Sequence, residues 1–421
     1  MEKRCRLKLE KERQRGLGFI SGLLAGVVLT SLVVVLAFGI GNNVAGHSAT
    51  NAETDAAGVS VTVEQGVINA DFINKLNTIE TLIEEYYYLE EVGDEVLREG
   101  AYEGVVAALG DPYSVYYTPE EAEEVFAQSE GIYYGIGAYV QLDTVTGYGM
   151  ITGTIKGTPA EEAGLRAGDI IYKVEGEDMA GLDLTQVVTR IKGEEGTKVH
   201  ITLVREGKEV EVAVERRKIE SPTVEHSMLD DKMGYVQITE FDDVTVNQFT
   251  EALKDLKNQK AEGMILDLRA NPGGNLYAVV DIADMLLGEG LILYTEDKAG
   301  RREEYKSDAK MAIDIPIVIL VDGNSASASE VLSGALKDHG EATLVGTTTF
   351  GKGIVQTIRT LRDGSAIKLT ISAYYTPSGT NIHGTGIEPD VVVEFDSEAY
   401  YGEGFDNQLE KAKEVLSEMI K

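Results

Sequence analysis

The sequence predicts a membrane-anchored, multidomain α/β protein. Three observations support this prediction: a long apolar run near the N-terminus, a glycine-rich block of short strand patterns at residues 131–218, and a later block in which strand and helix patterns alternate. Alternation of strands and helices implies a largely parallel sheet with helices packed on it. The 421 residues are enough for two or three domains.

Composition excludes some classes of protein. The net charge of -33 argues against a nucleic-acid partner, because phosphate contacts need stripes of Lys and Arg. The acidic residues are spread along the chain, which indicates a charged, soluble surface. The single cysteine, Cys5, cannot form an intrachain disulfide.

The N-terminus predicts a single membrane anchor. The run from Leu17 to Ile40 is uncharged, mostly apolar and long enough to cross a bilayer. Basic residues exceed acidic ones in residues 1–16, which places that segment in the cytoplasm and the rest of the chain on the extracytoplasmic side. The run is longer than a signal-peptide core, so an anchor (17–41) is favoured, although cleavage near VAGHSA stays open. Residues 42–67 form a polar tether.

Residues 68–130 predict an N-terminal helical region. Phe72, Leu76 and Ile79 recur at helical spacing, and a second helix is expected over about 94–109. Thr118 before Pro119 is a candidate N-cap for a third helix.

The two remaining blocks differ in pattern. In residues 131–218, four short strands (GAYVQL, GMITGTI, IIYKVEG and KVHITLV) surround two helices (TPAEEAG and LTQVVTRIKG). In residues 219–397, strands such as GMILDLR and IPIVILVD alternate with helices such as NQFTEALKDLKNQ. Residues 398–421 hold a terminal amphipathic helix over about 406–420.

Residues 321–334, VDGNSASASEVLSG, place three serines between a predicted strand and a predicted helix. A serine on such a turn is a candidate nucleophile, but it needs a base. Residue chemistry alone does not choose among Ser325, Ser327 and Ser329. Of the five histidines, only His383, in a glycine-rich loop, is kept as a reserve base.

A lysine is the preferred base. Lys352 lies between two glycines in FGKGIVQ, and its amine can accept a proton only if burial or a nearby positive charge lowers its pKa. Gln356, four positions later, faces the same way on an extended stretch and would orient the amine. The overlapping GTTTFGKG resembles a phosphate loop, but Gly353 replaces the required Ser or Thr and a strand pattern follows.

An oxyanion hole is also expected. LDLRANPGGNL ends a strand in a Gly-Gly turn before a helix, so backbone amides there are available for developing negative charge. Without the serine turn as a second motif, this segment would be interpreted only as a turn.

These motifs together resemble the carboxyl-terminal processing peptidases, the tail-specific S41 proteases with a Ser-Lys dyad. The resemblance rests on GDPYSVYYTPEE, GIGAYV, DLRANPGG, SASASEVLSGALKD, GTTTFGKGIVQ and YYTPSGTNIHGTGIEPDVVVE. It implies a crotonase-like, ClpP-like α/β protease core. It also implies Ser327 as nucleophile, Lys352 as general base and Gln356 as its orienting residue. The implied oxyanion donors are the amides of Gly273 and Ala328, with Gly274 as the alternative to Gly273.

The middle block resembles a PDZ domain. GIYYGIGAYV is similar to a carboxylate-binding loop, which offers backbone N–H groups to a peptide C-terminus while the peptide adds as a strand. The candidate residues are Gly135, Ile136, Gly137 and Ala138. Arg190 or Lys192, at the end of the second helix of this block, are candidates for gating the protease.

The resemblance implies an extracytoplasmic serine endopeptidase that cleaves proteins with a free, apolar C-terminal tail. It implies no metal and no cofactor, and it suggests a homodimer formed through the N-terminal and C-terminal helices. Two other interpretations stay open. One is a non-enzymatic PDZ adaptor on an inactive protease scaffold. The other is an acyl-transfer hydrolase without peptide specificity.

Overall fold

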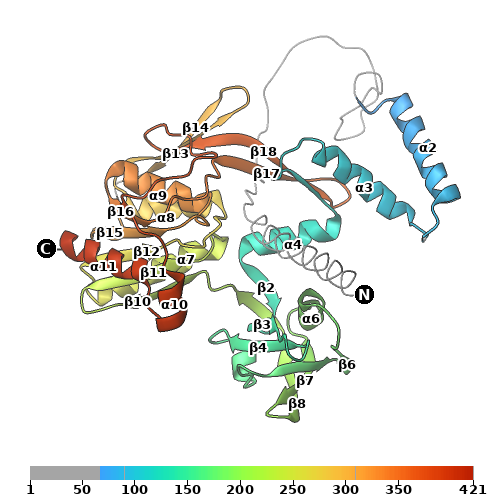
Figure 1. Ribbon diagram of the computed structural model, residues 1–421, viewed down its shortest axis with the longest axis horizontal. Helices are drawn as coiled ribbons and strands as arrows, with labels where there is room; N and C mark the ends of the chain where they lie inside the picture. Colours follow the sequence, from blue (N-terminus) through green and yellow to red (C-terminus); the bar gives the residue numbers. More distant parts are fainter. Residues whose placement is uncertain (1–66, 90, 309, 421) are drawn as a thin grey trace, which may run out of the picture.

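The computed structural model describes residues 67–89, 91–308 and 310–420 (Figure 1). The predicted cytoplasmic segment, the membrane anchor and nearly all of the tether lie outside these residues. Within the described ranges, no helix is both long and apolar enough to cross a membrane.

A six-stranded sheet organises the block after residue 219. Its order is β10–β11–β12–β15–β16–β19, and the pairings from β11 to β19 are all parallel, whereas β10 pairs antiparallel with β11. The strands are β10 (Val224–Met228), β11 (Met233–Ile238), β12 (Gly263–Asp267), β15 (Ile317–Val321), β16 (Ala342–Gly346) and β19 (Val391–Val392). The predicted, largely parallel sheet is therefore confirmed.

Helices cover both faces of this sheet. They are α7 (Asp243–Asn258), α8 (Leu276–Leu286), α9 (Ala328–His339) and α11 (Asn407–Met419). Along β12, Met264 and Leu266 pack among residues of α7, α8 and α9, whereas Ile265 packs with Ala412 and Leu416 of α11. Burial on both faces explains why the central strands read as continuous apolar runs.

A second, antiparallel sheet lies beside the first and extends toward the N-terminal helices (Figure 1). Its strands are β17 (Ile354–Thr360), β18 (Ala366–Tyr375), β13 (Gly290–Asp297), β14 (Arg302–Ser307) and β1 (Val115–Tyr117). β17 pairs along one edge of β18, while β1 and β13 pair with the two ends of the other edge. The β13–β14 hairpin and β1 were not among the strands predicted from the sequence.

The middle block is a separate sheet of order β3–β4–β5–β7–β8, with β6 paired to β5. Its elements are β3 (Ala138–Leu142), β4 (Gly149–Thr154), α5 (Pro159–Glu162), β5 (Ile170–Val174), β6 (Glu177–Asp178), α6 (Leu184–Ile191), β7 (Lys198–Arg205) and β8 (Lys208–Glu215). A ribbon of β2 (Ile132–Gly135) and β9 (Arg217–Glu220) connects this block to the rest of the chain. The buried residues Ile151, Val187 and Leu203 belong to a core of its own.

Three helices form the N-terminal region: α2 (Ala70–Tyr86), α3 (Asp94–Ala107) and α4 (Pro119–Glu130). The predicted N-cap is confirmed, because the Thr118 hydroxyl accepts the Glu121 amide and the Glu121 carboxylate accepts the Thr118 amide. α4 packs on the second sheet through Ala122, which contacts Ile358 and Ala366. In contrast, α2 has no buried residue.

Candidate active site

The serine turn lies between the end of β15 and the start of α9. Ser327 has φ 53° and ψ -110°, an uncommon backbone conformation for a residue with a side chain, and is 1% exposed. Such strain costs about 1–3 kcal/mol and persists only where surrounding contacts hold it. Here the Tyr374 hydroxyl donates to the Ser327 carbonyl at 2.9 Å, and the Ser327 amide donates to Glu330 at 2.8 Å.

The flanking serines have structural contacts. The Ser325 hydroxyl donates to the Leu268 carbonyl at 2.8 Å, and the Ser329 hydroxyl donates to the Asn271 carbonyl at 3.0 Å. Both bonds tie the serine turn to the turn that follows β12. This geometry distinguishes Ser327 from its two neighbours, a distinction that residue chemistry alone did not provide.

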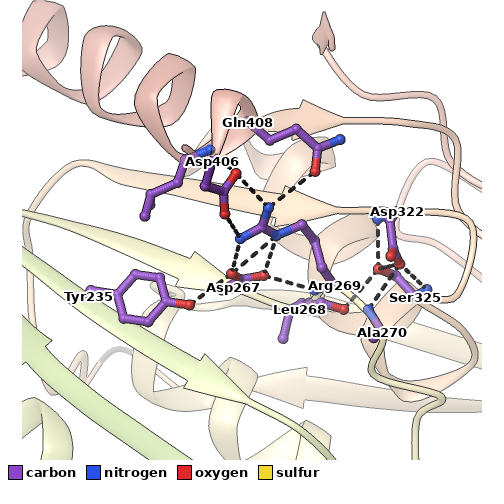
Figure 2. A network of polar contacts seen from close by, with 10 residues as sticks. Tyr235, Asp267, Leu268, Arg269, Ala270, Asp322, Ser325, Asp406 and Gln408 are labelled. Carbon is purple, nitrogen blue, oxygen red and sulfur yellow. Dashed lines mark hydrogen bonds and ion pairs between the residues drawn. The ribbon is translucent and has the colours of Figure 1, made fainter. Parts of the chain in front are cut away.

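A network of buried and partly buried polar side chains fixes the turn after β12 (Figure 2). The Arg269 guanidinium donates to Asp267 and to Asp406, with shortest distances of 2.6 and 2.8 Å, and also to Gln408. Asp406 and Gln408 belong to the start of the C-terminal helix, so this ion pair joins the chain end to the turn. In the same view, the Ala270 amide donates to Asp322 at 3.0 Å, which links the turn to the segment before the serines.

Gly273 lies against the candidate nucleophile. A Cβ on Gly273 would come within 2.8 Å of the Ser327 Cβ and 3.0 Å of the Ala328 nitrogen, so the contact requires glycine. In this conformation the Gly273 amide donates to the Asn271 side chain at 2.9 Å. Within the described part of the chain, the Gly274 and Ala328 amides have no hydrogen-bond partner. The Gly274 amide is therefore available as a donor without loss of an existing bond, whereas the Gly273 amide, which lies closer to the serine turn, would first have to leave Asn271.

Lys352 precedes β17 and is 7% exposed. Burial, assisted by the positive charge of Lys368, lowers the pKa of its amine from 10.5 to about 8, against the opposing charges of Glu330 and Asp111. Lys368 is itself 5% exposed and lies on β18. With a pKa of about 8, about a tenth of the amine is neutral at pH 7, far more than for a free lysine, and this neutral form is the one that general-base chemistry requires.

Glu330, which was not predicted from the sequence, connects the candidate nucleophile to the candidate base. One carboxylate oxygen accepts the amides of both Ser327 and Lys352, each at 2.8 Å. The other accepts the Gly351 amide at 2.7 Å and the Thr349 hydroxyl at 2.6 Å. Burial raises the pKa of Glu330 despite these donated bonds. The available sequence signal was its third position in α9, where Glu commonly bonds back to the N-cap amide.

Gln356 and His383 also lie in this area. Gln356 is 1% exposed, and its side-chain amide donates to the Thr370 hydroxyl at 3.4 Å. A register shift between Val355 and Gln356 interrupts the simple alternation from which its orientation was predicted. His383 is exposed, with its backbone against Gly353, and stays the reserve base.

The predicted carboxylate-binding loop connects β2 to β3. The Gly137 carbonyl accepts the Ile155 amide at 2.9 Å, and the Ile136 carbonyl accepts the Ala160 amide at 2.8 Å. Among the described strands, β3, which begins at Ala138, pairs only with β4, and its other edge lies toward α6. A peptide adding to that edge would begin beside the loop.

The two candidate gating residues lie at the end of α6. Arg190 forms an exposed ion pair with Glu177, and Lys192 lies over the Tyr133 ring, with 5.6 Å between the amine and the ring centroid. Neither contact reaches the serine turn.

Comparison with known proteins agrees with this arrangement. Three family models match: peptidase family S41 over residues 232–393, a PDZ domain over 150–205, and the N-terminal domain of the activating protease CtpB over 36–121. Carboxy-terminal processing protease CtpA of Bacillus subtilis is 37% identical over 323 residues, which cover 76% of this chain and 69% of that protein. The chain belongs to peptidase family S41.

Other relatives of this S41 peptidase agree. A probable CtpA-like serine protease of Staphylococcus aureus is 36% identical over 382 residues, covering 89% of this chain and 72% of that protein. A putative S41 protease from Bacteroides fragilis has the same fold, with a TM-score of 0.50 at 18% identity over 79% of this chain and 91% of that chain. The chain is thus a serine-type endopeptidase of the carboxy-terminal processing group, with a PDZ domain.

Proposed function

We propose that this S41 peptidase uses Ser327 and Lys352 as a catalytic dyad to cleave proteins whose free, apolar C-terminal tail its PDZ domain selects. The observation that carries the proposal is the single Glu330 oxygen that accepts the amides of both residues. It holds together two turns that are separate in sequence. The lowered pKa of the Lys352 amine supports the same assignment.

In the proposed mechanism, the neutral Lys352 amine takes the proton of the Ser327 hydroxyl as its oxygen attacks the scissile carbonyl carbon. The oxyanion is stabilised by the Ala328 amide and by the amide of Gly273 or Gly274. The protonated Lys352 then gives its proton to the leaving amine, and water hydrolyses the acyl-enzyme. Gln356 would help to fix the geometry on β17.

Selection of the tail is assigned to the PDZ domain. The loop of Gly135, Ile136, Gly137 and Ala138 would bind the terminal carboxylate, and the peptide would add to the free edge of β3. Arg190 and Lys192, on the neighbouring helix, are kept as candidates for transmitting occupancy to the protease core.

Location and assembly are also proposals. The apolar run 17–40 and the basic residues before it support an anchored protein whose catalytic part is extracytoplasmic. The exposed side chains of Leu76, Ile79 and Leu82 on α2, which are 38–50% exposed, support a homodimer that covers this helix.

Cleavage of an unstructured protein with apolar C-terminal residues tests the proposal. The full chain should cut it, the Ser327→Ala and Lys352→Ala variants should not, and the exposed-lysine control Lys298→Ala should cut normally. Amidation of the substrate's C-terminus should slow cleavage. Equal cutting by Lys352→Ala would exclude the dyad, and binding without cutting by the parent would favour the PDZ adaptor.

A further inference from the structure

A turn of the N-terminal region contacts the candidate base. This turn lies outside residues 232–393, the segment that the S41 family model matches. This turn, Asp111–Ser114, precedes β1, which pairs antiparallel with the start of β18. β13 pairs with the end of β18 on the same edge, so the turn occupies the interval between β1 and β13. At this interval it bonds Thr370, more than 250 residues away in sequence: the Ser114 hydroxyl accepts the Thr370 amide at 3.2 Å.

Asp111 extends a chain of hydrogen bonds that starts at Gln356. The Gln356 side-chain amide donates to the Thr370 hydroxyl at 3.4 Å, and that hydroxyl donates to the Asp111 carboxylate at 2.7 Å. The carboxylate also accepts the Ser114 hydroxyl at 2.6 Å and the Tyr113 amide at 3.0 Å. With all these donors, Asp111 is a fixed negative charge rather than a mobile surface carboxylate.

Tyr113 lies on the candidate base itself. Its ring centroid is 4.9 Å from the Lys352 amine, within the range of a cation–π contact. The ring therefore both covers the amine and presents its negative face to it. Lys352 is otherwise influenced by Lys368 from β18, Glu330 from α9 and the charge of Asp111. The charge of His383, from the adjacent loop, contributes to lowering the pKa of Asp111.

We infer that the Asp111–Ser114 turn is part of the active site, with Tyr113 and Asp111 as positioning residues that set the surroundings of the Lys352 amine. Tyr113 excludes water from the amine, which favours its neutral form; this effect outweighs the attraction of the ring face for the ammonium, because burial is the largest influence on the amine. Asp111 attracts the charged form and holds β18 in register with the turn. The inference rests on the proposed role of Lys352 as the base.

The two residues have opposite effects, which makes the inference testable. Asp111→Asn keeps the shape of the side chain and removes the charge that favours the ammonium, so the acid limb of the kcat/KM profile should move to lower pH. Tyr113→Ala admits water, and because burial is the largest cause of the lowered Lys352 pKa, the limb should move to higher pH. Shifts of about 0.5–1 pH unit are expected, and 1 unit corresponds to about a tenfold change in kcat/KM below the limb.

The matched controls are Tyr113→Phe, which keeps the ring, and Asp94→Asn in α3. Both should leave the limb in place. A general loss of structure would lower the rate without moving the two limbs in opposite directions. The inference would be overturned if the acid limbs of Asp111→Asn and Tyr113→Ala lie at the same pH as those of the controls, or if both limbs move in the same direction.

A second measurement does not depend on catalysis. In the full chain carrying Ser327→Ala, the rate of Lys352 acetylation by acetic anhydride is followed against pH by mass spectrometry, with and without the turn variants. The midpoint should fall for Asp111→Asn and rise for Tyr113→Ala, and unchanged midpoints would refute the role of the turn. Retained proteolysis by Lys352→Ala would instead refute the dyad, so the two failures are distinguishable.

Discussion

Replacing Lys352 by Met should inactivate the protease and at the same time stabilise its fold at pH 7. The amine is buried, and its pKa falls from 10.5 to about 8 in the folded chain. Below pH 8 the amine is protonated in both states, and the folded state bears the cost of burying the charge. A lowering of this size corresponds to about 3 kcal/mol of lost stability, an upper limit for the gain on substitution by a side chain of similar length.

The two pKa values of Lys352 also give the direction of the stability change and the pH range over which it appears. The penalty is fully present below about pH 8, declines as pH rises toward 10.5, and is absent above that value, where the amine is neutral in both states. The stabilisation by Lys352→Met should therefore be largest at pH 7 and fade between pH 8 and pH 10.5. For a domain of this size, about 3 kcal/mol corresponds to a rise in Tm of roughly 6–12 °C.

Calorimetry of the full chain at several pH values measures this effect in the transition of the protease core. The control is Lys298→Met, which removes an exposed lysine on the β13–β14 hairpin and should leave Tm unchanged. A Lys352→Met variant that is less stable than the parent at pH 7 would refute the reasoning. A gain that persists unchanged at pH 10.5 would also refute it, since it would not come from the charge.

Three further substitutions test other parts of the structure. Glu330→Gln should lower kcat by about tenfold or more and destabilise the core by about 1–3 kcal/mol, because an NH2 group, which donates, replaces an oxygen that accepts two donors. The control is Ser333→Ala, which removes a bond within α9. Normal kcat in Glu330→Gln would contradict a positioning role. Asp169→Asn should lower the Tm of the PDZ transition through the loss of about 1–3 kcal/mol, because it breaks the ion pair of a buried carboxylate with the partly exposed Arg205; Glu162→Gln, at a pair in which both side chains are exposed, should have little effect, and equal shifts would count against the importance of burial. Gly274→Ala should abolish activity and soluble expression, because its Cβ would come within 2.1 Å of the Phe241 carbonyl oxygen, while Gly323→Ala, whose nearest contact is 3.9 Å away, should be tolerated; a folded, active Gly274→Ala would show that the turn is less rigid than its contacts indicate.

The parts of the fold that the sequence predicted depend on local pattern. Strands buried on both faces, such as β12 and β15, give continuous apolar runs, and the N-cap at Thr118 has its own residue signature. The β13–β14 hairpin lacked such a pattern, because β14 alternates charged residues with little burial. The helix predicted from TPAEEAG is present as α5 but has only four residues, since Gly164 follows with positive φ.

The candidate site could be proposed from the sequence where chemistry and motif coincide, as at Ser327 and Lys352. Glu330 was missed because its sequence reads as an ordinary helix start, and only the fold brings the Gly351 and Lys352 amides to its carboxylate. The contact of Tyr113 with Lys352 was unpredictable for the same reason. It joins segments more than 200 residues apart, and no local periodicity reports such a pairing.

The most direct test of the central claim is the pH dependence of acylation at Ser327. An activated peptide ester is added to the full chain and to Lys352→Ala, and the modified residue is mapped by mass spectrometry. We expect that Ser327 alone is acylated, at a rate that rises through about pH 8 in the parent and is lower by about 100-fold or more in the variant. Acylation of another serine, or equal rates in the parent and Lys352→Ala, would contradict the claim.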